Sequence, residues 1–252
     1  MYTLKKYLSE ALVKHKISNY DNGEVVDFGL SVKWLKYNLA GNKLTDDESD
    51  YGYYYQWGST VGYPDATKLE FTWETTPYIK DFNEPTFTKY VTDSYYGDID
   101  NKKILDPEDD AVTTLLGSKY RMPTIEEYKE LCKHCIGGDS YRRTDKLSGI
   151  TSVSKNGIYW IMPNTMVDNI KYSHRGVLFV GQDITKRIFF PTGGECNGSY
   201  IYNKTYGYYW SSSLESGLSK KASRLYFTSE NIFPCDHQQR YYGAPIRGVK
   251  VK

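Results

Sequence analysis

The first hydrophobic pattern in the chain is helical and lies at its N-terminal end. Within residues 3–16, apolar side chains recur at i, i+3, i+4, i+7 and i+8, with lysines and a glutamate largely opposite. This spacing predicts an amphipathic helix. A helix of about 14 residues is marginal alone in water, so its apolar stripe must dock on another surface. The stripe consists of Leu4, Tyr7, Leu8, Ala11 and Leu12.

A turn-rich stretch, ISNYDNG at 17–23, follows this segment. The Asn22-Gly23 pair favours positive φ angles, which is typical of a turn or linker. We therefore expect residues 1–23 to form an arm and linker, and residues 24–252 to form one domain. The arm either packs on its own domain or docks on a partner or a second copy, and the linker favours docking.

From residue 24 onward, short runs rich in aromatic residues alternate with Gly, Asp and Asn turns. Runs of this kind are typical of half-buried strands. The expected strands are Val25–Phe28, Ser31–Trp34, Tyr51–Trp57, Gly157–Met162, Val177–Val180, Arg187–Phe190, Tyr206–Ser211, Ser223–Phe227 and Ile246–Val251.

Two helices interrupt these strands in the prediction. The first begins with Asp106 as N-cap, Pro107 at the first helical position and acidic residues in the first turn. The second begins at Thr124, which forms a capping box with Glu127, and ends at Gly137-Gly138. Two helices among many strands predict a single α+β domain.

Composition and charge narrow the classes of protein. Tyrosine supplies 26 of the 252 residues, and Lys+Arg minus Asp+Glu is 32 − 31 = +1. A balanced charge gives no reason to expect nucleic acid or an anionic membrane as partner. No apolar run approaches the length of a membrane helix, and Glu10, Lys14 and Lys16 interrupt the apolar region that a secretory signal requires. We therefore expect a protein made in a cytoplasm without a signal peptide.

The sequence offers little for catalysis or metal binding. Four cysteines are too few for a disulfide scaffold, and Cys132 and Cys135 lie on one helix face, so reduced thiols are expected. The acidic stretch 98–110 lacks the glycine and terminal glutamate of an EF-hand. Helix capping accounts for its Asp106, Glu108 and Asp109, so calcium is left open there but not expected. We predict no catalytic residues, no metal and no cofactor.

Two C-terminal stretches, 198–213 and 227–245, combine Tyr and Trp with Ser, Asn and Gly. Rigid aromatic side chains beside adaptable polar ones are typical of binding surfaces. Core packing accounts for Trp210, Tyr226 and Phe227, but less well for the polar run 236–239, which the pattern places between strands. The candidate ligand-binding residues are Tyr208, Asn231, Asp236, His237, Gln238, Gln239, Tyr241 and Tyr242.

Nine segments resemble, in order, the major paralogous (FISUMP) domain of gut Bacteroidetes proteins. They are VDFGLSVKW (26–34), DYGYYYQWG (50–58), FTWET (71–75), LDPEDDAV (105–112), KYRMPTIEEYKEL (119–131), FFPTGG (189–194), YYWSSS (208–213), LYFTS (225–229) and RYYGAPIRGV (240–249). The resemblance implies a C-type-lectin-like α+β fold with variable later loops and no catalytic residues. Tyr120 replaces a common tryptophan, and the sugar-and-calcium motifs of true lectins are absent.

Family members on bacterial surfaces look like exported lipoproteins, which carry a signal and a lipid-anchor cysteine. In this sequence a short amphipathic arm takes the place of that signal. Related domains form receptor-binding tips of phages. Together these features predict a non-enzymatic head- or tail-fibre subunit in the virion of a gut Bacteroidetes (crAss-like) phage. Its arm would dock on capsid or tail proteins, and its domain, as a homo-oligomer, would bind a host-surface glycan or receptor.

Two alternatives remain open. The first is a bacterial surface adhesin. The second, more distant, is an oxidoreductase similar to formylglycine-generating enzymes, in which Cys196 and Cys235 would form the redox pair.

Overall fold

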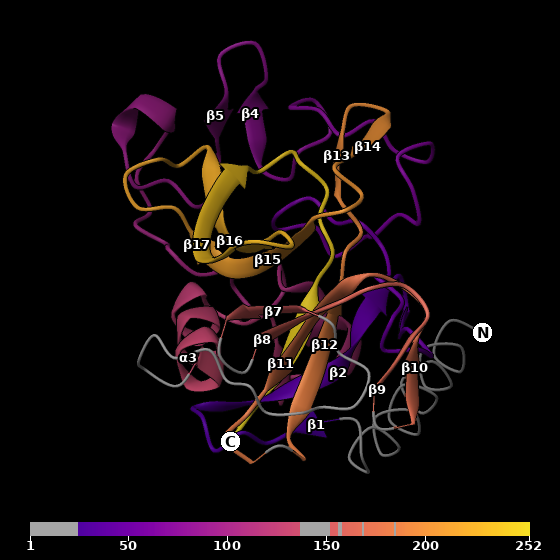
Figure 1. The fold of residues 1–252 in the computed structure, drawn as a ribbon. Coiled ribbons are helices and arrows are strands. Elements are labelled where there is room, and N and C mark those ends of the chain that lie inside the picture. Colours follow the sequence, from indigo (N-terminus) through magenta and orange to yellow (C-terminus); the bar gives the residue numbers. More distant parts are fainter. Residues whose placement is uncertain (1–24, 137–151, 156–157, 168, 184) are drawn as a thin grey trace, which may run out of the picture.

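The structure is a computed structural model that describes residues 25–136, 152–155, 158–167, 169–183 and 185–252. Figure 1 shows their arrangement. The predicted arm with Leu4, Tyr7, Leu8, Ala11 and Leu12, the linker 17–23 and the helix end at Gly137-Gly138 all lie outside the described residues.

The first sheet joins the two ends of the described chain. Its order is β1 (Val25–Val26), β2 (Val32–Ala40), β18 (Arg247–Val251) and β6 (Tyr120–Arg121), and β3 (Lys43–Leu44) also pairs with β2. The last strand, β18, therefore lies between β2 and β6 and runs antiparallel to both. Because long-range pairing closes this sheet, the domain is complete only when its C-terminal strand is in place.

The second sheet is buried on both faces. Its order is β12 (Arg187–Pro191), β11 (Gly176–Val180), β8 (Ile158–Ile161) and β7 (Ser152–Lys155). Every residue of β8 and β11 is buried. Side chains alternate between two clusters, because successive strand residues point to opposite faces. One cluster is the main core, and the other packs under the hairpin β9 (Thr165–Val167)–β10 (Ile170–Tyr172).

The third sheet consists of β15 (Gly207–Leu214), β16 (Lys221–Phe227) and β17 (Ile232–Gln239), with β17 at its edge. Tyr209, Leu225, Phe227 and Ile232 of this sheet join the main core. That core also holds the buried side of helix α3, and Figure 1 shows the helix below this sheet. The opposite face of the sheet carries the aromatic residues described in the next subsection.

Helix α3 (Ile125–Ile136) begins as predicted. The backbone N–H of Thr124 donates to Glu127 Oε2 at 2.7 Å, and the N–H of Glu127 donates to Thr124 Oγ1 at 3.3 Å, which confirms the capping box. Its buried side consists of Ile125, Tyr128, Leu131, Cys132 and Cys135.

Helix α2 (Ala111–Leu116) does not begin at Asp106, so that part of the prediction was wrong. Asp110 is the N-cap, and its Oδ1 accepts from the backbone N–H groups of Val112 and Thr113, both at 2.9 Å. The earlier acidic residues are engaged by side chains from elsewhere in the chain, which leaves Asp110 as the carboxylate nearest the free N–H groups.

The rest of the described chain consists of short elements and loops. They are the hairpins β4 (Ile79–Asp81)–β5 (Thr86–Phe87) and β13 (Glu195–Asn197)–β14 (Tyr200–Tyr202), and the 3₁₀ turn η1 (Ser94–Tyr96). The strand expected at Tyr51–Trp57 is replaced by two isolated bridges, Tyr54 with Tyr63 and Tyr55 with Ala244.

The predicted α+β class was wrong. The described residues form eighteen mostly short strands in six small sheets, with two α-helices of 6 and 12 residues. The C-type-lectin-like α+β architecture implied by the resemblance falls with that class. No helix within these ranges has the length and apolar character needed to cross a membrane.

Candidate functional site

The candidate site lies on the face of the β15–β16–β17 sheet opposite the main core, where three aromatic rings stack across the strands. The inner part of this face, with Tyr208 and Trp210, belongs to a second buried cluster, and its β17 edge is exposed. The register pairs Tyr208 with Tyr226 and Tyr226 with Phe233. The first two ring centroids are 5.0 Å apart with planes at 6°, and the second two are 5.2 Å apart at 8°. Since these distances match the spacing of neighbouring strands, the rings stand side by side on the sheet.

Exposure increases along this stack toward the sheet edge. Tyr208 is 4% exposed, Tyr226 is half-buried and Phe233 is 44% exposed. Tyr208 was predicted to contact a ligand, but it is buried, and its hydroxyl accepts a hydrogen bond from Asn203 at 3.2 Å. Tyr208 therefore supports the stack, and Phe233 presents the accessible ring.

A buried arginine fixes the polar side of the stack. The guanidinium carbon of Arg224 lies 4.3 Å from the centroid of the Tyr208 ring. Its Nη1 donates to Glu195 Oε2 at 2.5 Å, and its Nε donates to Asp236 Oδ2 at 2.7 Å. Asp236 is 29% exposed in its side chain, so its carboxylate is both oriented and accessible. An oriented carboxylate beside an exposed ring is able to accept hydrogen bonds from a bound hydroxyl group.

A β-bulge places Phe233 and Asp236 together. The register between β16 and β17 shifts between Arg224 and Tyr226, so residues three apart on β17 reach the same face. Simple alternation would have placed them on opposite faces.

The polar run 236–239 was expected to lie between strands, and this prediction was wrong. The run belongs to strand β17. Its side chains consequently divide between the two faces. Gln238, opposite Ala222, shares the face of Asp236. His237, opposite Ser223, points to the other side, where its Nδ1 lies 3.7 Å from Glu215 Oε2. Gln239 ends the strand opposite Lys221.

The other predicted site residues lie in loops around the sheet. Asn231 is an exposed turn residue whose carbonyl accepts from the N–H of Thr228 at 2.8 Å. The rings of Tyr241 and Tyr242 contact each other at 4.7 Å, and Tyr241 also contacts Trp73 at 4.8 Å. These two tyrosines form a second, half-buried aromatic pair, separate from the stack.

The sequence reasoning missed three residues of this face. Phe233 and Arg224 were not singled out, and Tyr226 was assigned to the core although it is half-buried. Trp210 and Phe227 are buried as expected. The pairing of the strands is the signal that identifies these residues, because it sets Tyr226 between the inner ring of Tyr208 and the outer ring of Phe233.

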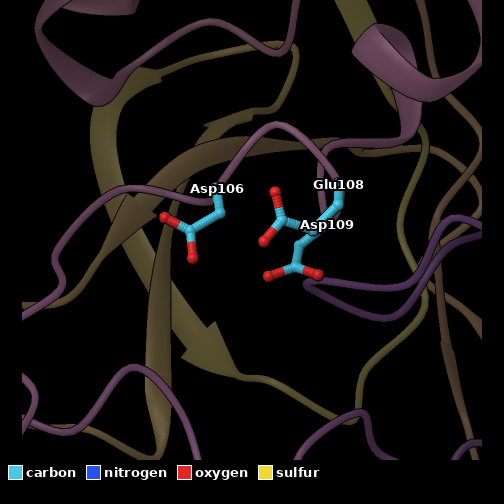
Figure 2. Close-up of side chains that lie close together, drawn as sticks. All are labelled: Asp106, Glu108 and Asp109. Carbon is cyan, nitrogen blue, oxygen red and sulfur yellow. The ribbon is translucent and has the colours of Figure 1, made fainter.

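The acidic stretch forms a cluster in which Asp106, Glu108 and Asp109 bring carboxylate oxygens within 4.8 Å of one another (Figure 2). A lysine from another segment occupies the position that a cation would take. Lys89 Nζ lies 2.6 Å from Asp106, 3.4 Å from Glu108 and 2.5 Å from Asp109. Lys102 adds a second ion pair to Asp106 at 2.5 Å.

Two tyrosines complete this cluster, since the hydroxyls of Tyr78 and Tyr90 both donate to Asp109. Burial alone would raise the pKa of Asp109, but the hydrogen bonds from Lys89 and the two tyrosines outweigh it and lower that pKa. The three acidic residues were expected to cap a helix. They instead form a lysine-centred structural cluster that ties the turn before α2 to residues 78–90.

The four cysteines differ in their exposure. Cys132, Cys135 and Cys196 are buried, and Cys235 is exposed on β17. Burial raises the pKa values of Cys135 and Cys196, which disfavours the nucleophilic thiolate. Cys196 lies on β13 in a cluster with Tyr54 and Phe71, so it contributes to packing.

Comparison with known proteins finds no family model, no curated protein and no solved structure that matches this chain. The case for a function therefore rests on the residues and geometry described above.

Proposed function

We propose that this protein is a non-enzymatic binding protein that recognises a host-surface glycan through the outer face of the β15–β16–β17 sheet. The observation that carries this proposal is the stack ending in the exposed ring of Phe233, beside the oriented carboxylate of Asp236. An exposed aromatic face takes the apolar side of a sugar ring, and the carboxylate accepts from its hydroxyls.

The rigidity of this face supports recognition. Phe233 is held by the ring behind it, and Asp236 by an arginine that is itself 4% exposed. Side chains ordered before binding lose little entropy when a ligand arrives. The open edge position of β17 also suits a long surface polysaccharide, which requires a site that is not enclosed.

The proposal further places the protein in the virion of a phage that infects gut Bacteroidetes, as a head- or tail-fibre subunit. The resemblance of segments 26–34, 119–131 and 240–249 to FISUMP domains supports this, and the amphipathic pattern of residues 3–16 supplies the docking element. In this proposal the arm binds other virion proteins, and several copies act together, which raises avidity for a repetitive surface.

The glycan part is tested by measuring binding of the full chain to purified capsular polysaccharides of gut Bacteroidetes. Phe233→Ala is expected to weaken binding at least tenfold. Phe82→Ala is the matched control, because Phe82 is 45% exposed against 44% for Phe233 and lies in the turn directly after β4. Equal loss in both variants, or binding unchanged by Phe233→Ala, contradicts the proposed face.

The virion part is tested by expressing tagged chains in an infected host and sedimenting the particles. Leu8→Asp with Leu12→Asp is expected to abolish co-sedimentation. Lys6→Glu changes the net charge by the same −2 on the opposite side of the predicted helix and should leave co-sedimentation intact. Particles that never carry the wild-type chain would contradict the virion assignment.

A further inference from the structure

A second concave site lies away from the aromatic stack, in a groove of about 330 Å³. Its walls come from the loop after β3, with Tyr51 and Tyr54, from His174 and Arg175 just before β11, and from Lys204 after β14. This volume is at the lower end of the range for small-molecule sites. The groove therefore suits one small ring rather than an extended chain.

The groove is basic. Arg175, Lys204 and His174 line it, and none of its described lining residues carries a carboxylate. Asp50 and Asp65, which act electrostatically on Tyr51, do not line it. Both carboxylates accept hydrogen bonds within their own turns. Asp50 accepts from the backbone N–H of Gly52, and Asp65 accepts from the backbone N–H of Thr67.

Arg175 is left with unused hydrogen-bonding capacity. Its Nε is buried and has no hydrogen-bond partner among the described residues. Its backbone is fixed, because its carbonyl accepts from the N–H of Thr192 at 2.8 Å. A buried donor without a partner is costly, so the guanidinium is not fully satisfied by the protein itself. The same side chain lines the groove, where an anionic ligand would meet its terminal N–H groups.

The aromatic wall of the groove is equally well fixed. The hydroxyl of Tyr54 donates to the carbonyl of Gly193 at 2.5 Å, and the ring of Tyr51 contacts Tyr54 at 5.9 Å and His174 at 6.0 Å. A Cβ at position 193 would lie 2.9 Å from Tyr51 Cβ and Cγ, so glycine allows the ring to lie against this wall. Thr192 and Gly193 of the FFPTGG motif, which the proposed function leaves unexplained, thus line the groove.

We infer that this groove binds a single sugar ring bearing an oxyanion, such as an acidic unit of a surface glycan. The planar guanidinium of Arg175 matches a carboxylate or phosphate group, Lys204 adds a second positive charge, and Tyr51 faces the ring. The inference deepens the proposed function, since it adds an acidic subsite to glycan recognition. It does not use Phe233 or Asp236.

The test is a titration of the full chain with free small molecules, followed by nuclear magnetic resonance or calorimetry. D-Glucuronate provides a carboxylate, D-glucose 6-phosphate a phosphate, D-glucose a neutral ring and inorganic phosphate an anion without a ring. At least one of the two acidic sugars is expected to bind at least tenfold more tightly than glucose and than inorganic phosphate. The stronger of the two identifies the source of the oxyanion.

Arg175→Gln and Lys204→Gln are each expected to weaken that binding, the first at least tenfold. Lys80→Gln, which removes an exposed charge on β4, should leave it unchanged. The inference is overturned if neither acidic sugar binds, if glucose or phosphate binds equally well, or if Arg175→Gln has no effect while the variant remains folded. The polysaccharide experiment with Phe233→Ala is independent, so failure of either site is distinguishable from failure of the other.

Discussion

Arg247 donates from its Nε to the side-chain oxygen of Asn38 at 2.6 Å, although 209 positions separate the two residues. The same guanidinium donates to the carbonyls of Leu35 at 3.1 Å and Phe189 at 2.9 Å. It is fully buried, and burial lowers its pKa. One side chain on β18 therefore joins β2 to β12, and with them the first sheet to the second.

Arg247→Lys is expected to destabilise the protein by roughly 2–4 kcal/mol, because an ammonium group cannot reach all of these acceptors and leaves some of them unpaired. Urea unfolding measures the difference. Arg121→Lys is the control, since Arg121 is 30% exposed in its side chain and its guanidinium pairs with one carboxylate, that of Glu127. Its cost should be smaller than that of Arg247→Lys, because water reaches this guanidinium and an ammonium group still pairs with Glu127. Equal costs for the two variants would show that Arg247 does not hold the sheets together.

The lysine-centred cluster predicts a dependence of stability on pH. The hydrogen bonds from Lys102 and Lys89 lower the pKa of Asp106. The hydrogen bonds from Lys89 and the two tyrosines lower the pKa of Asp109. The ordinary pKa of each carboxyl group is 3.8. A carboxyl group whose pKa is lowered in the folded state stabilises the protein at pH values above its ordinary pKa. This stabilisation is lost as the pH falls through the pKa of the folded state. The free energy of unfolding should therefore decrease below about pH 4.

Lys89→Met removes the centre of this cluster and is expected to cost roughly 2 kcal/mol at pH 7, because three carboxylates then face one another. The difference from wild type should shrink as the pH falls below 4 toward the lowered pKa values of Asp106 and Asp109, because the carboxylates are then progressively protonated. Lys102→Met is the control, because Lys102 is 44% exposed in its side chain and contacts only Asp106 in the cluster. A difference for Lys89→Met that does not change with pH would contradict the electrostatic explanation.

Features set by neighbouring residues were predictable from the sequence. The capping box of Thr124 and Glu127 needs residues only three apart, and the strand at Arg187–Phe190 is visible as a run of apolar and aromatic residues. Both were found where they were expected. Local physical chemistry, such as a free N–H group and a nearby carboxylate, decides features of this kind.

Features set by distant residues were not predictable. Asp106 looks like a helix cap until Lys89, from a separate loop, is placed beside it. Asp236 looks like a loop residue until the bulge on β17 sets it next to Phe233 and Arg224. In each case a side chain that comes from elsewhere in the fold decides the role, and a single sequence does not show which side chain that is.

Gly194, which follows the groove residue Gly193, permits a close approach to the end of β14. Its φ is +70°, and a Cβ there would lie 2.1 Å from the carbonyl oxygen of Tyr202. Gly198 also has a positive φ, +55°, but has nothing within 4 Å of a Cβ. Gly198→Ala should therefore cost roughly 1 kcal/mol from backbone strain alone. Gly194→Ala should cost at least about 2 kcal/mol more, because backbone atoms must also move. Thermal unfolding of the two variants measures the difference. Equal losses of stability in Gly194→Ala and Gly198→Ala would contradict this explanation.

The aromatic stack predicts that its two ends contribute differently to stability. Tyr208 is buried under Tyr226 and Arg224, so Tyr208→Ala is expected to cost roughly 3–5 kcal/mol as a large-to-small core substitution. Phe233→Ala exposes little new surface and should cost about 1 kcal/mol or less. Chemical denaturation of both variants gives the comparison.

A double-mutant cycle isolates the ring contact itself. Combining Phe233→Ala with Tyr226→Ala should reveal a coupling of roughly 0.5–1.5 kcal/mol, since the two rings stack at 5.2 Å. Combining Phe82→Ala with Tyr226→Ala should show no coupling, because Phe82 follows β4 of the β4–β5 hairpin, a sheet separate from the one that carries Tyr226. A zero coupling between Tyr226 and Phe233 would mean that the stack does not order the exposed ring. Phe233 would then lose its full side-chain conformational entropy when a ligand binds.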